Sequence, residues 1–181
     1  VIHRLALTLN ADYRGMPLSV TSPQGRFATE AAILDGTEID HAEAFGKHLF
    51  VHFTAADPAH ILYIHLGLIG KFSLAPHAPV RGQVRLRIGD GATDADLRGP
   101  QTCELLDEAA WRRVRERLGA DPIRDDADWT VPWRRVRASG RSIAELLMDQ
   151  SITAGVGNIY RAESLFRAGI DPWRPARDLD P

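Results

Sequence analysis

Residues 146–172, LLMDQSITAGVGNIYRAESLFRAGIDP, carry the most informative pattern in the sequence. Ser142 precedes it and is followed three residues later by Glu145, which is the capping-box pattern of a helix start. A GVG run then relaxes the backbone, and Asn158 is a favoured N-cap for a second helix. The pattern predicts two helices joined by a glycine-rich link. The N–H groups at the start of the second helix favour an anion such as a DNA phosphate, although an ordinary helical hairpin shows the same pattern.

Both predicted helices carry apolar residues at helical spacing, which we expect to pack inwards. In the first helix they are Ile143, Leu146 and Leu147, and in the second Ile159, Ala162, Leu165 and Phe166, with Gly169 as the stop.

Composition limits the class of protein. The 181 residues suit one large domain or two small ones, and a hydrophobic fraction of 44% is enough for a core. No apolar run is long enough to span a membrane. The single cysteine, Cys103, can build neither a disulfide framework nor a cysteine zinc site within the chain. We therefore expect a cytoplasmic protein.

Charge is unevenly distributed, although the net charge is only −2. Acidic residues crowd positions 121–128, and the arginines that follow directly are Arg134, Arg135, Arg137 and Arg141. A local basic face can hold phosphates on a slightly acidic chain. A solvated, arginine-rich surface helix is the more common explanation of such a cluster.

The first hundred residues favour strands, preceded by a helix. Helical spacing over residues 1–13 predicts a helix whose start lies before residue 1. Alternation and turn residues predict strands within residues 16–22, 38–45, 48–54, 61–74 (two strands around a glycine turn at 67–70), 83–88 and 92–97. In the first alternating pair, we expect one face to carry Ile39, His41, Glu43 and Phe45, and the next strand to separate Leu49, Val51 and Phe53 from His48, Phe50 and His52.

An amphipathic helix is expected over residues 107–118, with Asp107 as its cap and Gly119 at its end. Its buried stripe would be Ala110, Trp111, Val114 and Leu118. The predicted fold class is α+β. A β-sandwich domain with a flanking helix would occupy residues 1–104, and a helical domain built on the helix–link–helix segment would occupy residues 105–181.

The run MDQSITAGVGNIYRAESLFRAGIDP resembles the helix–two-turn–helix segment of the Fpg/Nei family of DNA glycosylases, and the match is long and nearly gapless. The runs HRLA and SPQGRF are similar to the endonuclease VIII type of that family, in particular its actinobacterial members. The resemblance implies a base-excision repair enzyme that removes oxidised bases through a Schiff base and cleaves the abasic site by β,δ-elimination. Its partner would be double-stranded DNA containing oxidised bases or abasic sites.

The resemblance also implies catalytic groups. GKHLF matches the family position of a lysine needed for strand cleavage, which is carried over to Lys47. A surface lysine is the plainer alternative. The family nucleophile is an N-terminal proline followed by glutamate, in a Met-Pro-Glu-Gly start just before the first helix. Val1 falls inside that helix, so we expect this sequence to be part of a longer chain.

The family's DNA-contacting residues map onto both predicted domains. His65 matches a phosphate-contacting histidine, and Leu68, between Gly67 and Ile69, matches a wedge that fills the gap left by a flipped base. Burial of Leu68 and Ile69 in the core is the alternative. The arginine–phenylalanine pair of some members is absent, because Arg98 is followed by Gly99 and Pro100.

In the helical part, the resemblance implies that Asn158 contacts phosphate and that Arg161 and Glu163 support it. Arg117, in RLGADPI, matches a basic residue that can contact DNA, and a solvated helix-end charge is an equal alternative.

We expect no metal or other cofactor within this chain. The family's four-cysteine zinc finger would lie C-terminal to residue 181. Six histidines do not show the paired spacing of a zinc site, namely His41, His48, His52, His60, His65 and His77. We expect a monomer associated with the nucleoid. A non-catalytic module that binds damaged DNA is the rival hypothesis.

Overall fold

A computed structural model describes residues 1–179, and the expectations for residues 180–181 lie outside the described part. The chain divides into two compact units, residues 1–112 and 113–181. The expected domain boundary at residue 104 lies within β8, before this division. Among the described residues, no helix is both long and apolar enough to cross a membrane.

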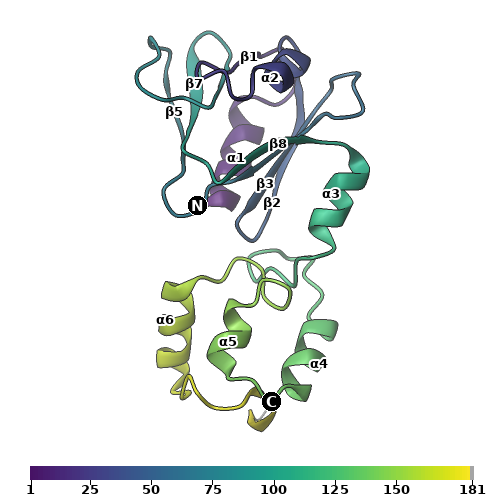
Figure 1. The fold of residues 1–181 in the computed structure, drawn as a ribbon, viewed down its shortest axis with the longest axis vertical. Helices are drawn as coiled ribbons and strands as arrows, with labels where there is room; N and C mark the ends of the chain where they lie inside the picture. The colour runs from purple at the N-terminus through teal and green to yellow at the C-terminus, as the bar shows by residue number, and fades with distance from the viewer. Residues whose placement is uncertain (180–181) are drawn as a thin grey trace. The chain divides into compact units, whose positions relative to one another are not determined.

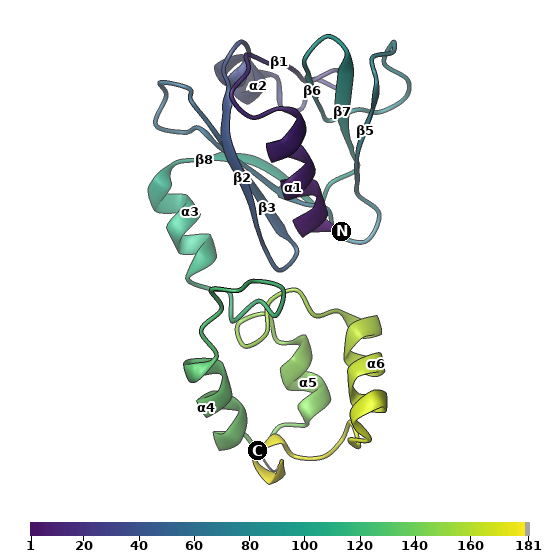
Figure 2. The ribbon, with the colours of Figure 1, turned by 180° about the vertical axis from the view of Figure 1, so that it is seen from behind.

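The first unit contains two four-stranded antiparallel sheets, with strand orders β1–β6–β7–β5 and β2–β3–β4–β8 (Figures 1 and 2). Its strands are β1 (Ser19–Thr21), β2 (Ile39–Phe45), β3 (His48–Phe53), β4 (Ile61–His65), β5 (Lys71–Pro76), β6 (Leu86–Gly89), β7 (Thr93–Arg98) and β8 (Thr102–Leu106). Its helices are α1 (Ile2–Asp12), α2 (Ala28–Leu34) and α3 (Glu108–Arg115), the last of which crosses into the second unit. The predicted α+β class, with a β-sandwich and a flanking helix, is confirmed.

The core of this unit forms where α1 packs along β2 and β3, as Figure 2 shows. Helical spacing places Ile2, Ala6 and Leu9 on the buried side of α1. Leu49, Val51 and Phe53 point into the same core, as the alternation predicts. The opposite face of β3 therefore presents His48, Phe50 and His52.

The predicted face of β2 was wrong at one residue. The register with β3 shifts between Ile39 and His41, so that Asp40 is an extra residue in the strand. Ile39 consequently turns into the core with Ala42 and Ala44, instead of sharing a face with His41 and Glu43. A one-residue shift reverses the face of every residue beyond it, and simple alternation cannot foresee it.

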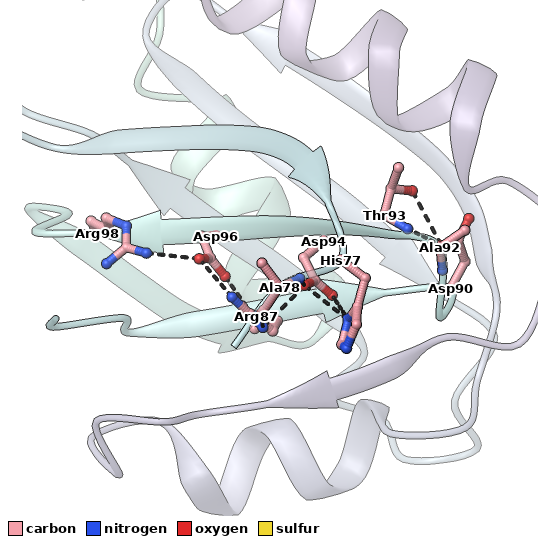
Figure 3. A network of polar contacts seen from close by, with 9 residues as sticks. All are labelled: His77, Ala78, Arg87, Asp90, Ala92, Thr93, Asp94, Asp96 and Arg98. Carbon is pink, nitrogen blue, oxygen red and sulfur yellow. Dashed lines mark hydrogen bonds and ion pairs between the residues drawn. The ribbon is translucent and has the colours of Figure 1, made fainter. Parts of the chain in front are cut away.

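The second sheet carries an ion-pair network on β6 and β7 (Figure 3). Arg87 binds Asp96 with two nitrogens, Nε to Oδ1 at 2.7 Å and Nη2 to Oδ2 at 3.0 Å, and its Nη1 lies 3.0 Å from Asp94. Arg98 donates to Asp96 at 2.8 Å and to the Arg81 carbonyl. The Arg87 hydrogen bonds lower the pKa of Asp96 below its ordinary value. Arg98 is thus part of the ion-pair network that stabilises this sheet.

The second unit contains α4 (Thr130–Ala138), α5 (Ile143–Met148), α6 (Asn158–Ala168) and a short 3₁₀ helix, η1 (Ala176–Asp178). The predicted capping box is confirmed, because the Ser142 hydroxyl accepts from the Glu145 N–H and the Glu145 carboxylate accepts from the Ser142 N–H. The core of the unit is small and includes Val136, Ile143, Leu146, Ile152, Leu165 and Ala176.

Two expectations for α6 were wrong. Gly157 is the N-cap, and Asn158 is the first helical residue rather than the cap. The apolar stripe is not buried: Leu165 alone is inside, whereas Ile159 and Phe166 are 76% and 85% exposed. The small core accommodates one side chain of this helix, so periodicity identified the helix but overestimated its burial.

The helix over residues 107–118 is shorter and less buried than expected. Asp107 caps it, accepting from the Ala110 N–H at 2.6 Å, but the helix ends at Arg115, and its predicted stripe is only half-buried. Gly119 has another role. Its N–H donates to the Gln150 carbonyl, and a Cβ there would lie 2.2 Å from the Ile152 oxygen. Close approach of two backbones therefore requires glycine.

Candidate nucleic-acid interface

Strand pairing places two of the candidate residues in the first unit, Lys47 and His65, beside His48. His48 and His65 are direct partners across β3 and β4, with ring centroids 4.9 Å apart, and Lys47 immediately precedes His48. Lys47 lies in the tight turn that joins β2 to β3, where Gly46 has a φ of +60°. We call Lys47, His48, Tyr63 and His65 the lysine–histidine corner.

The interior of this corner is neutral. His48 Nδ1 lies 2.8 Å from the Tyr63 hydroxyl, and the two rings are stacked. Burial lowers the pKa of His48 to about 4 and raises the pKa of Tyr63 to about 12. Near neutral pH, an uncharged imidazole is therefore hydrogen-bonded to a protonated phenol.

His65 and Lys47 are the members through which this corner can meet a ligand. Burial lowers the pKa of His65, and the Gln101 side chain is hydrogen-bonded to its ring. Burial also lowers the pKa of Lys47, which shifts the balance from ammonium toward amine. A neutral imidazole can donate one hydrogen bond, and a lysine with a lowered pKa gives up its proton more readily than a solvated lysine does.

The link between β4 and β5 is a tight loop with an exposed apolar tip. Leu68 is fully exposed and Ile69 is 88% exposed, so the alternative that they fill the core is excluded. Gly67 has a φ of +68°, and a Cβ at Gly70 would lie 2.2 Å from the Leu66 oxygen. Both glycines are needed for the loop to close, which holds the tip out in solvent.

In the second unit, Asn158 and Arg161 interact at the N-terminus of α6. Arg161 donates to Asn158 Oδ1, and Asn158 is exposed. With Oδ1 occupied, the amide group left for an external acceptor is Nδ2–H₂. The Arg161 Nε is buried and has no hydrogen-bond partner among the described residues.

Arg117 is an exposed residue of the turn after α3, and its backbone N–H donates to the Val114 carbonyl. Glu163 is exposed on α6. The geometry thus couples Asn158 with Arg161 and leaves Arg117 and Glu163 outside that pair.

Sequence reasoning missed His48, Tyr63 and Gln101. Alternation placed His48 on the outer face of its strand, but only the register of β3 with β4 shows that it meets His65 and Tyr63. Gln101 immediately precedes β8, the strand paired with β4. No local sequence pattern predicts its hydrogen bond to His65.

The cysteine zinc finger that the resemblance implies does not fit the residues of this chain. Cys103 is the single cysteine, and burial in β8 raises the pKa of its thiol to about 12. Zinc binds thiolate, and a structural zinc finger of this kind needs four of them.

Two family descriptions match the chain. Residues 9–103 match "Formamidopyrimidine-DNA glycosylase N-terminal domain". Residues 118–181 match "Formamidopyrimidine-DNA glycosylase H2TH domain". The first match spans β1 to β7 and the start of β8, and the second spans α4, α5 and α6.

Curated relatives agree. The chain is 45% identical to "Endonuclease 8 1" of Mycobacterium tuberculosis over 184 aligned residues, covering 98% of this chain and 68% of that protein. It is 34% identical over 153 residues to "Formamidopyrimidine-DNA glycosylase" of Thermus thermophilus, covering 82% of this chain and 55% of that protein.

Solved structures share the fold. Lactococcus lactis formamidopyrimidine-DNA glycosylase, bound non-covalently to DNA containing an abasic site, matches with a TM-score of 0.82 and 24% identity, over 99% of this chain and 71% of that chain. MutM in complex with DNA containing carbocyclic 8-oxo-G matches with a TM-score of 0.81 and 24% identity, over 99% of this chain and 72% of that chain.

Proposed function

The chain belongs to the formamidopyrimidine-DNA glycosylase family, and from this premise we propose that it removes oxidised bases from double-stranded DNA and cleaves the abasic site that remains. The observation that supports the cleavage step is the lysine–histidine corner. It combines a lysine of lowered pKa with a neutral histidine, beside a loop whose apolar tip is exposed.

In the proposed reaction, an amine attacks C1′ of the damaged nucleoside, the base departs, and a Schiff base forms. We assign that amine to the N-terminus of the complete protein. The Schiff base acidifies the C2′ proton, and its removal expels the 3′ phosphate; a second elimination expels the 5′ phosphate. Lys47 would transfer protons in these eliminations. Its lowered pKa supports this role, because the ideal acid–base group titrates near the working pH.

The groups that hold DNA would divide their tasks. His65 would donate a neutral hydrogen bond to a phosphate near the lesion, and Leu68 with Ile69 would fill the space left by the flipped base. An exposed apolar tip on a loop closed by two glycines supports the wedge role, since burial of the tip in a base stack would recover the cost of its exposure to water.

In the second unit, Asn158 would bind a phosphate through Nδ2, and Arg161, which donates to Asn158 Oδ1, would orient it and add a charged contact to DNA. The N-terminal N–H groups of α6 would strengthen the phosphate contact. Arg117 would be a peripheral phosphate contact. We further propose a monomer that acts in the cytoplasm, on nucleoid DNA.

Duplexes with and without an oxidised base test the proposal. Binding is followed by fluorescence anisotropy, and strand cleavage by gel electrophoresis with end analysis of the products. The proposed enzyme cleaves only the damaged strand and leaves phosphate at both ends of the gap, as β,δ-elimination requires. Tight binding of damaged DNA by the complete protein without any cleavage would support the rival, a non-catalytic module for damaged DNA.

A further inference from the structure

A second cluster of titratable side chains lies on the outer face of β2 and β3 and takes no part in the proposed DNA chemistry. His41 and His52 are cross-strand partners, and Glu43 is two residues from His41 on the same face. A ring nitrogen of each histidine and a carboxylate oxygen of Glu43 all lie within 4.8 Å of one another. We call these three residues the β2–β3 triad.

The shift in the β2 register creates the triad. Because Asp40 is an extra residue, Ile39 enters the core and His41 turns outward, opposite His52. The two imidazoles are then stacked, with ring centroids 4.1 Å apart and an angle of 12° between their planes. His41 and His52 are well separated in the sequence, and the pairing of β2 with β3 brings them together.

Two members already have the spacing of ligands to one ion. His52 Nε2 lies 3.3 Å from Glu43 Oε1, which is long for a charge-assisted hydrogen bond. Two ligand atoms at about 2.1 Å from a tetrahedral ion are separated by about 3.4 Å, which is close to this distance. Both side chains are well buried, at 9% and 19% exposure, and the edge of the His52 ring contacts Trp111 at 5.5 Å. This half of the triad is therefore held in place by packing.

His41, the third member, makes a hydrogen bond to a carboxylate, as metal-binding histidines usually do. His41 Nδ1 lies 2.8 Å from the Asp40 carboxylate, which holds the proton on Nδ1 and leaves Nε2 as the coordinating nitrogen. His41 is 42% exposed, so its ring can turn toward the other two ligands and solvent can supply the remaining ligand.

We propose that His41, Glu43 and His52 bind one divalent transition-metal ion, with Zn²⁺ as the ion that its two imidazoles and one carboxylate suit best. Three protein ligands leave one tetrahedral position for water. The ion would join β2 to β3 beside Trp111 and stabilise the first unit. This site is separate from the family's cysteine zinc finger and needs neither DNA nor the proposed enzyme activity.

Isothermal titration calorimetry of Zn²⁺ into the untagged chain tests the proposal, with thermal unfolding as a second readout. We expect one ion per chain and a higher unfolding temperature with Zn²⁺. His41→Ala and Glu43→Gln should each weaken binding by at least about tenfold and remove the thermal shift, and Asp40→Asn should weaken it by about tenfold.

The matched control is His77→Ala, which removes an exposed histidine beside a carboxylate, Asp94, on the other sheet. It should leave Zn²⁺ binding unchanged. Absence of stoichiometric binding, or equal binding by the wild type and His41→Ala, overturns the proposal and leaves the triad as a hydrogen-bonded cluster. His41 is exposed enough for its alanine variant to fold, and circular dichroism checks this.

Discussion

At the scale of single residues, the environment of Lys47 distinguishes it from an ordinary surface lysine. It follows Gly46 in the tight turn between β2 and β3, and desolvation lowers its pKa. Lys71, the other lysine of the chain, is exposed at the start of β5. The two residues therefore form a natural comparison between a candidate acid–base group and a solvated charge.

Lys47→Ala should reduce cleavage of abasic-site DNA by about 100-fold or more, because positioned acid–base groups contribute on that order. Binding of the same duplex should change little, since one lysine supplies a small part of the phosphate contacts. Single-turnover cleavage and anisotropy on the same samples measure both. Lys71→Ala is the control and should cleave normally; wild-type cleavage by Lys47→Ala would remove Lys47 from the mechanism.

Leu68 makes a second prediction at this scale. Leu68→Ala should keep the fold, because the side chain is fully exposed. It should lower excision of an oxidised base by about tenfold, since an alanine cannot fill the space that base flipping opens. Cleavage at a pre-formed abasic site should fall less, because no base has to be extruded. Val80→Ala, at another exposed apolar position, should have no effect; equal losses on the two substrates would argue against a wedge.

At the scale of elements, α6 is the part that sequence reasoning located best and described least accurately. The capping box of α5, the glycine link and the α6 span were all foreseen, because they depend on local backbone preferences. The cap residue and the buried stripe were wrong, because they depend on how much core the unit provides. The exposed Ile159 and Phe166 show that helical periodicity reveals an amphipathic helix without revealing whether its apolar face is covered.

Two variants of α6 separate a neutral phosphate contact from a charged one. Asn158→Ala should weaken binding of all duplexes similarly and leave the salt dependence unchanged, because an amide displaces no counterion. Arg161→Gln should also weaken binding and reduce the slope of log K against log salt by about 1. Anisotropy titrations at several salt concentrations distinguish them.

Arg167→Gln is the matched control, since Arg167 lies in the last turn of the same helix. It should change neither the affinity nor the slope. A slope that falls with Asn158→Ala but not with Arg161→Gln would contradict the assignment of the charged contact.

Strand faces could be predicted from the sequence only in part. Alternation correctly assigned the faces of β3, and it failed in β2, where one extra residue at Asp40 reverses the pattern. Cross-strand partners such as His48 with His65, or His41 with His52, depend on register and cannot be read from one strand alone. The lysine and the exposed loop tip were therefore foreseeable, whereas the neutral histidine–tyrosine pair and the β2–β3 triad were not.

At the scale of the whole molecule, stability should depend on pH in two windows. A buried histidine with a lowered pKa takes up a proton more readily when the chain unfolds, so stability is lost as pH falls below the unfolded value. For His48 that window runs from 6.5 down to about 4. Asp96, whose pKa is lowered by Arg87, contributes stability that is lost at still lower pH, below its ordinary value of 3.8.

His48→Gln tests the first window. The variant keeps a hydrogen-bonding group near Tyr63 but does not titrate, so its unfolding temperature should change less than that of the wild type between pH 6.5 and 4. Thermal unfolding followed by circular dichroism at half-unit pH steps measures this. An identical pH dependence in both proteins would show that His48 is not a source of the acid sensitivity.

We propose that the complete protein forms a covalent Schiff base with abasic DNA, and its membership of the glycosylase family supports this. Borohydride reduces such an intermediate to a stable amine, so the most direct measurement is trapping of the complete protein on a labelled duplex that contains one abasic site. We expect a protein–DNA adduct that appears only with borohydride and only on abasic DNA. Lys47→Ala should still form this adduct but should fail to cleave the strand. A complete, folded protein that binds this duplex and yields no adduct would contradict it.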